Sequence, residues 1–156
     1  MPLTAKKARA LAAPGSAVGP ARYSLYKMAY GRINEALQQG FYLEAITIVE
    51  SLVSDRLESR LTFLLGTDFS FKTLGQLITK IRGTETDSGL LLLVDKDLDQ
   101  WREARNKSLH EMAKIEDGDS STWADRFTSL VPTSKEGLRV LRAIDARCKA
   151  LRKLGE

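Results

Sequence analysis

The chain has a single histidine, His110, and it closes the segment of residues 105–110, which reads Arg-Asn-Lys-Ser-Leu-His. An imidazole can accept or donate a proton near neutral pH, and a guanidinium presents a fixed fork of donors that fits phosphate oxygens. Together these groups are sufficient for cleaving RNA without a metal. In that reaction the 2′-hydroxyl attacks the adjacent phosphate, which needs proton transfer and stabilisation of a highly charged phosphorane.

A helix is expected to carry these groups, because residues 95–114 contain no glycine or proline. Their apolar side chains recur at spacings that fit a helix, at Leu98, Trp101, Leu109 and Met112. At about 100° per residue, Asn106 and His110 lie one turn apart on the same face, and Arg105 lies about 140° from His110. A long arginine side chain can still curl toward that face. Arg105, Asn106 and His110 are therefore the candidate catalytic residues.

Two further cations flank this cluster and are candidates for substrate binding. Arg102 lies one turn before Asn106, and Lys107 follows it directly. A second interpretation is that the arginines belong to a solvated helix face, since Asp99 stands three residues before Arg102 and can pair with it. A single histidine on an amphipathic helix is likewise more often a surface residue than a catalyst. Asn106 has a poor preference for helix interiors, so a reason other than helix formation is expected for it.

The order of these residues resembles the R-x4-6-H motif of the HEPN superfamily (higher eukaryotes and prokaryotes nucleotide-binding domains), with Arg105, Asn106, three residues and then His110 on a late helix. Residues 41–65 resemble the long early helix of such domains. The resemblance covers most of residues 22–154. It implies a metal-independent endoribonuclease of the toxin or antiviral-defence type, which needs no cofactor.

The resemblance also implies an arrangement of the site. Domains of this superfamily typically dimerise with their motif helices facing each other, so two Arg-His sets share one cleft. By that analogy Arg105 stabilises the scissile phosphate, His110 transfers a proton or holds the 2′-hydroxyl, and Asn106 positions either of them. An antitoxin or a regulatory protein is the expected partner besides RNA. Some toxin members carry a modified tyrosine three residues after the histidine; here that residue is Ala113, so neutralisation by simple binding or by another mechanism is expected instead.

Helical periodicity elsewhere predicts an all-α, up-and-down helical bundle of HEPN type with short accessory helices. Long helices are expected over residues 21–39, 41–65, 90–114 and 135–154, and short ones over 73–81 and 123–130. We expect Gly40 to end the first helix. Pro132 is expected to stop the short helix over 123–130, and Ser134 to cap the N-terminus of the last helix. The tyrosines of the first helix are interpreted as core residues. Glu50 has apolar neighbours and either turns partly inward toward Arg105 or faces solvent.

The remaining sequence bounds the class of protein. A length of 156 residues suits one domain, predicted as a HEPN-like unit over residues 21–156 behind a flexible basic arm at 1–20. The single cysteine, Cys148, excludes an intramolecular disulfide and is interpreted as a core thiol. No metal-binding pattern stands out. The longest apolar run, residues 90–94, is too short to cross a bilayer, so a cytoplasmic protein is expected.

Two other functions stay open at this point. The first alternative is a non-catalytic helical module that binds a protein partner or a nucleotide. The second is a nonspecific nucleic-acid binder, because the net charge is +4 and cations gather in the arm and along residues 135–154. Those cations are equally consistent with an ordinary solvated helix surface.

Overall fold

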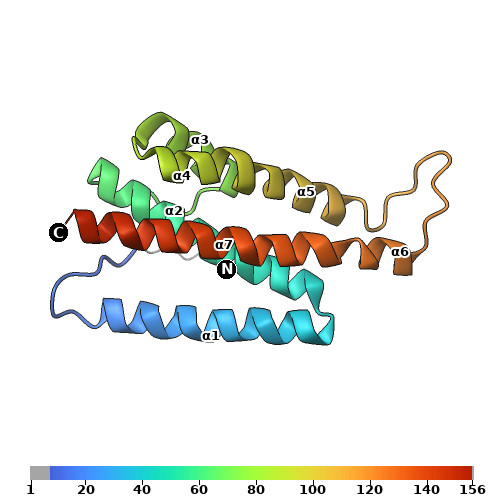
Figure 1. Ribbon diagram of the computed structural model, residues 1–156, viewed down its shortest axis with the longest axis horizontal. Coiled ribbons are helices and arrows are strands. Elements are labelled where there is room, and N and C mark those ends of the chain that lie inside the picture. Colours follow the sequence, from blue (N-terminus) through green and yellow to red (C-terminus); the bar gives the residue numbers. More distant parts are fainter. Residues whose placement is uncertain (1–7, 156) are drawn as a thin grey trace, which may run out of the picture.

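The computed structural model describes residues 8–155, which form an up-and-down bundle of helices (Figure 1). The long elements are α1 (Val18–Gln39), α2 (Tyr42–Leu65), the continuous run of α4 (Ser88–Leu92), η1 (Leu93–Leu98) and α5 (Asp99–His110), and α7 (Leu130–Leu154). The short helices α3 (Leu74–Thr84) and α6 (Trp123–Thr128) lie at opposite ends of the bundle. Residues 8–155 contain no strand. The predicted all-α bundle with short accessory helices is therefore confirmed.

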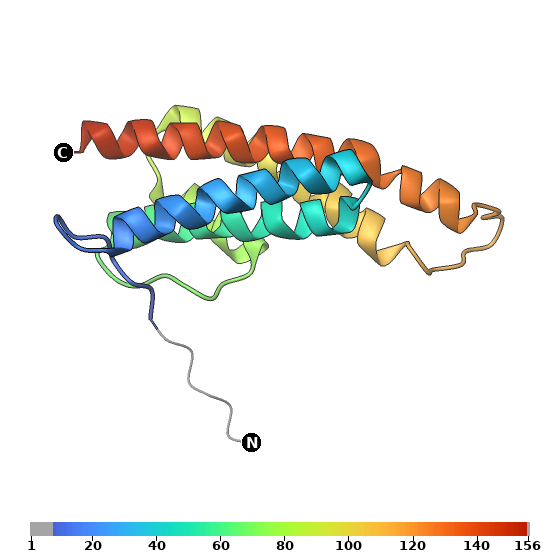
Figure 2. The same cartoon turned by 90° about the horizontal axis from the view of Figure 1, so that it is seen from below.

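Helices α2 and α7 form the centre of the bundle, where they pack against each other along most of their length (Figure 2). Helix α1 covers α2 on one side, and the run from α4 to α5 covers α7 and α3 on the other. Each long helix buries one stripe of aliphatic side chains, and full burial of each such side chain contributes about 1.5–3 kcal/mol. The largest fully buried side chains include Ile33, Ile46, Leu57, Leu61, Leu98, Leu141 and Ile144.

The ends of the first two long helices follow from local sequence. Gly40 (φ +79°) and Gly66 (φ +68°) adopt the left-handed conformation that favours glycine and end α1 and α2. The predicted bounds of α2 differ from the observed ones by one residue. Helix α1 begins at Val18 rather than at residue 21. Tyr26 is buried as expected, but Tyr23 is 70% exposed, so its prediction as a core residue was wrong.

Helix α3 is longer than predicted. Thr73 caps its N-terminus through reciprocal hydrogen bonds with Gln76, and the helix continues through Thr84 instead of ending at residue 81. Residues 85–87 form a short connection from α3 to α4. Glu85 in this connection is buried. Its carboxylate accepts hydrogen bonds from Arg60 of α2 at 2.6 and 3.0 Å, which satisfy the buried charge.

The helix that carries the candidate catalytic residues is shorter than predicted and ends at His110 rather than at residue 114. Beyond it, Arg126 Nη1 donates to the main-chain oxygens of Glu111 at 2.6 Å and Lys114 at 2.5 Å. The Arg126 guanidinium thus replaces the backbone N–H donors that these two carbonyl groups would have in a longer helix. Met112 packs against the core, which folds the chain back toward the bundle. Contacts with a distant arginine therefore decide where this helix stops.

Helix α7 begins at Leu130, which corrects the expectation that Pro132 stops one helix and Ser134 caps the next. Pro132 occupies the first turn, where a backbone N–H has no partner within the helix, so proline is tolerated there. Ser134 is buried, and its hydroxyl donates to Val131 O at 2.8 Å. The added turn lets α7 span the bundle from α6 to its free end (Figure 1).

Candidate functional site

Arg105 points from α5 toward α2, where its Nη2 donates to Glu50 Oε1 at 2.7 Å. The Arg105 side chain is only 15% exposed, and its Nε is buried without a hydrogen-bond partner among the described residues. Of the two orientations considered for Glu50, the structure has the one that turns partly inward toward Arg105. A carboxylate that accepts from one end of a guanidinium limits its motion and leaves its other donors for a ligand.

His110 lies at the C-terminal end of α5 and is exposed, while Asn106 lies one turn earlier and is half-buried. Neither side chain has a hydrogen bond or an ion pair within residues 8–155. An axial rise of about 1.5 Å per residue separates the backbones of Arg105 and His110 by about 7.5 Å. The histidine therefore faces solvent, and the arginine is held against the bundle a little more than one turn away.

Arg102 is engaged on a different side of the helix. Its guanidinium pairs with Asp99 at 2.8 Å and lies near Gly75 of α3. Arg82 of α3 pairs with the same carboxylate at 2.8 Å. Burial raises the pKa of Asp99, but hydrogen bonds from Arg82 and Arg102 outweigh it and hold that pKa below its usual value. The structure therefore places Arg102 in a network between α3 and α5 and not beside Asn106 and His110.

Lys107 is exposed and lies at the edge of a cavity of about 240 Å³ next to the end of α5. Ser108, Glu111, Arg126 and Ser129 line the rest of this cavity. The Arg126 side chain is held in place by two further hydrogen bonds, which it donates to Asp119 Oδ2 at 2.7 Å and Ser121 Oγ at 3.0 Å. Two cations, Lys107 and Arg126, thus flank a hollow at the end of α5.

Sequence reasoning did not identify Arg126 or Ser129 as parts of this region. Both follow the polar segment 111–122, which carries no helical periodicity and no motif that would place them near α5. Only the turn of the chain through that segment, from the end of α5 back into α6, brings them beside Lys107 (Figure 1).

Three of the seven cations of the last helix pair with carboxylates. Arg139 pairs with Glu136 and Asp97, Arg147 with Asp87, and Lys149 with Asp145. This pairing is typical of an ordinary solvated surface at these three positions and interrupts a continuous phosphate-binding one. In the basic arm, Arg9 is also engaged by carboxylates, and Lys6 and Lys7 lie outside the described residues.

Comparisons of this chain with protein-family models, curated proteins and solved structures find no match. Across residues 8–155, no group of histidine, cysteine and acidic side chains is arranged to hold a metal ion. None of the described helices is long and apolar enough to cross a membrane. What the end of α5 offers is one imidazole in solvent, one oriented guanidinium and one amide between them.

Proposed function

We propose that this protein is a metal-independent endoribonuclease of the HEPN type, which cleaves RNA by attack of the 2′-hydroxyl on the adjacent phosphate. One observation carries the proposal: Glu50 anchors Arg105 at 2.7 Å through Nη2 while 15% of the Arg105 side chain stays exposed, and the exposed His110 lies on the same helix. A guanidinium with unused donors suits a phosphate oxygen. An exposed imidazole is accessible to a ribose hydroxyl.

In this proposal each residue has a separate role. Arg105 stabilises the negative charge that develops on the phosphorane, and His110 transfers a proton to or from the reacting oxygens. Asn106, on the same face as His110, positions the ribose or the imidazole. Lys107 holds a neighbouring phosphate at the cavity of about 240 Å³. Arg102 contributes indirectly, because its network with Asp99 keeps α5 in place against α3.

Cleavage of this kind benefits from both an acid and a base, and one chain supplies a single histidine. We therefore propose that two copies pair through α5 and contribute two Arg-His sets to one cleft. The outer side of α5 supports this: Gln100, Glu103, Lys107 and His110 are exposed at spacings of three and four. Such a stripe leaves a helix face for a second chain.

The biological role follows the same proposal. A ribonuclease with an open catalytic histidine damages the cell that makes it, so we place this protein in the cytoplasm as a toxin or antiviral effector controlled by a protein partner. Ala113 lacks the hydroxyl that a nucleotidyltransferase would modify, and the proposed control is direct binding.

The test is RNA cleavage in excess EDTA, with analysis of the product ends. The parent protein should leave 2′,3′-cyclic phosphate ends, and His110→Ala and Arg105→Ala should abolish the activity. Arg32→Ala is a suitable control, because this surface arginine of α1 pairs with Glu44 and lies on a different helix. Cleavage that persists in His110→Ala, or that requires magnesium, would contradict the proposal. A folded dimer that cleaves no RNA would favour the non-catalytic binding module instead.

A further inference from the structure

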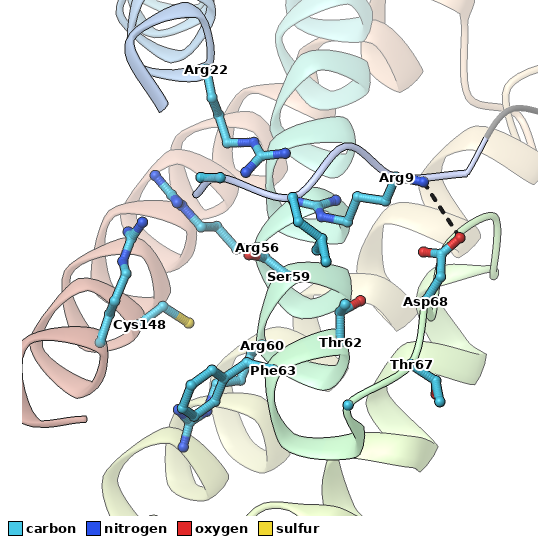
Figure 3. Close-up of a pocket in the computed structure, with 14 residues that line it drawn as sticks. Arg9, Arg22, Arg56, Ser59, Arg60, Thr62, Phe63, Thr67, Asp68 and Cys148 are labelled. Carbon is cyan, nitrogen blue, oxygen red and sulfur yellow. Dashed lines mark hydrogen bonds between the residues drawn. The ribbon is translucent and has the colours of Figure 1, made fainter. Parts of the chain in front are cut away.

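A larger cavity, of about 390 Å³, lies at the end of the bundle away from His110 (Figure 3). It is lined by Arg9, Leu11 and Ala12 of the N-terminal arm, the start of α1, the second half of α2 with residues 66–68 after it, and the end of α7. Its volume falls in the range of pockets that hold small organic ligands. Five arginines line it: Arg9, Arg22, Arg56, Arg60 and Arg152.

Arg9 is the most informative of these residues. It comes from the arm, yet its side chain is only 6% exposed. Its Nη1 donates to Asp55 at 2.6 Å and to Glu58 at 3.3 Å, and its Nη2 is buried with no hydrogen-bond partner among the described residues. Figure 3 shows the Arg9 side chain reaching from the arm into the middle of the cavity. A buried donor without an acceptor is costly, so an acceptor in the cavity would stabilise the structure.

The neighbouring arginines converge on the same region. Arg22 of α1 approaches Asp55 at 3.9 Å and donates to Ala10 O at 3.0 Å. Arg56 of α2 is nine-tenths buried, lies 4.1 Å from the centre of the Tyr26 ring and pairs with Asp145. The guanidinium groups therefore meet from the arm, α1 and α2, which is an arrangement that an incoming anion can bridge.

The carboxylates that partner these arginines lie behind them. Asp55, Glu58, Glu85 and Asp145 accept from the arginines without lining the cavity, and Asp68 is the one acidic residue among those that line it. The Arg152 side chain of α7 has no hydrogen bond or ion pair within residues 8–155. A guanidinium has five N–H donors, so each paired arginine keeps donors for a ligand. The inner surface is thus rich in donors and poor in acceptors.

The rest of the wall is apolar. Leu11 and Phe63 face the cavity with 65% and 67% of their surface exposed, and Cys148 contributes its thiol from α7. Exposed large apolar side chains beside a cluster of arginines suit a ligand that has a charged and an apolar end. The available volume exceeds what a single phosphate group fills.

We propose that this cavity binds a small molecule with a phosphate monoester attached to an apolar or aromatic group. The phosphate lies between Arg9, Arg22 and Arg152, and the apolar part lies against Leu11 and Phe63. Because the arm forms one wall through Arg9 and Leu11, the bound ligand fastens the arm to α2 and α7. This site is separate from α5, and it stands whether or not the protein cleaves RNA.

Isothermal titration calorimetry on the full chain at low ionic strength tests the proposal. Phenyl phosphate should bind with one site per chain and more tightly than inorganic phosphate, and phenol should not bind. Adenosine 5′-monophosphate and glycerol 3-phosphate, as further probes, distinguish an aromatic from an aliphatic partner for Phe63. Arg152→Gln and Arg22→Gln should each weaken phenyl phosphate binding about tenfold, as expected for a lost charged hydrogen bond.

Control variants distinguish a loss of ligand binding at the cavity from a loss of folding and from a general loss of positive charge. Arg139→Gln removes an exposed arginine of α7 outside the cavity and should leave the affinity unchanged. Phe63→Ala should weaken phenyl phosphate but not inorganic phosphate, since this exposed side chain contacts only the apolar part. Thermal unfolding checks that each variant is folded. The proposal is overturned if no phosphorylated probe binds, or if Arg22→Gln and Arg152→Gln bind phenyl phosphate as well as the parent does.

Discussion

The indole of Trp101 packs directly on Gly137, so that the helix carrying the candidate site touches α7 at a residue without a side chain. A methyl group at Gly137 would lie 2.8 Å from Trp101 Nε1 and 2.9 Å from Cε2. The same indole donates from Nε1 to Thr133 O at 2.9 Å. Because Trp101 is 2% exposed and contacts α7 at both Thr133 and Gly137, it sets the distance between α5 and α7.

Gly137→Ala should therefore destabilise the protein by about 1–3 kcal/mol, since overpacking outweighs the gain in helix propensity. Gly31→Ala is the matched control, because a methyl group at Gly31 in α1 meets no atom within 4 Å. That variant should be more stable by about 0.5–1 kcal/mol. Chemical denaturation of both variants measures the difference. Equal stability of the two would show that the indole can move away without cost.

Glu50 should act as a positioning residue for Arg105. In Glu50→Ala the guanidinium loses its anchor at 2.7 Å, and we expect kcat for RNA cleavage to fall about tenfold, or about 1.4 kcal/mol. Glu50→Gln keeps an acceptor and should recover most of that loss, with little change in KM. An equal fall of kcat in Glu50→Ala and Glu50→Gln would contradict this positioning role. A change confined to KM would assign Glu50 to substrate binding instead.

A shared cleft predicts that two inactive variants complement each other. Arg105→Ala and His110→Ala should each be inactive alone, and a mixture in which subunits have exchanged should regain part of the cleavage activity, because the mixed cleft keeps one of its two histidines. The mixed dimer keeps Arg105 on one protomer and His110 of the partner subunit. Size-exclusion chromatography of differently tagged chains verifies that mixed dimers form. If they form without regaining activity, each site requires both residues from the same chain.

Stability at acid pH should depend on Asp87. A hydrogen bond from Arg147, together with one from Leu90 N, holds the pKa of Asp87 at about 2, below its usual 3.8. A lowered pKa in the folded state means that this stabilisation is present above pH 3.8 and is lost as the pH falls toward 2. Asn also caps helices, so Asp87→Asn removes the charge and keeps the cap.

The difference in unfolding free energy between the parent and Asp87→Asn should thus be largest near pH 5–7 and should shrink between pH 4 and 2. Urea titrations across this range measure it. A difference that stays constant down to pH 2 would mean that the pairing of Asp87 with Arg147 does not survive in solution.

Cys148 should react slowly with thiol reagents in the native protein. Burial raises the pKa of its thiol to about 11, so little thiolate is present at pH 8. Reaction with a disulfide reagent should be slow in buffer and fast in denaturant, and the native rate should keep rising with pH above 9. A rapid native reaction at pH 7 would indicate that the end of α7 opens readily.

The sequence by itself determined which segments are helical and in what order they occur. Apolar residues at spacings of three and four dictate a buried stripe on each helix, because the backbone geometry repeats every 3.6 residues. Gly40 marks the end of α1, and the apolar stripe of α2 extends across nearly its full observed length. The proximity of Arg105 and His110 along one helix was likewise visible, since it needs no tertiary contact.

Only the tertiary structure decided how those helices end and what their polar side chains contact. Helix α5 stops at His110 because Arg126 binds the carbonyls beyond it, and Arg102 is drawn to Asp99 and α3. The arginine-lined cavity depends on Arg9 meeting Asp55, a residue 46 positions away. Such contacts depend on how the helices dock, and no periodic pattern along the chain encodes which distant charges will meet.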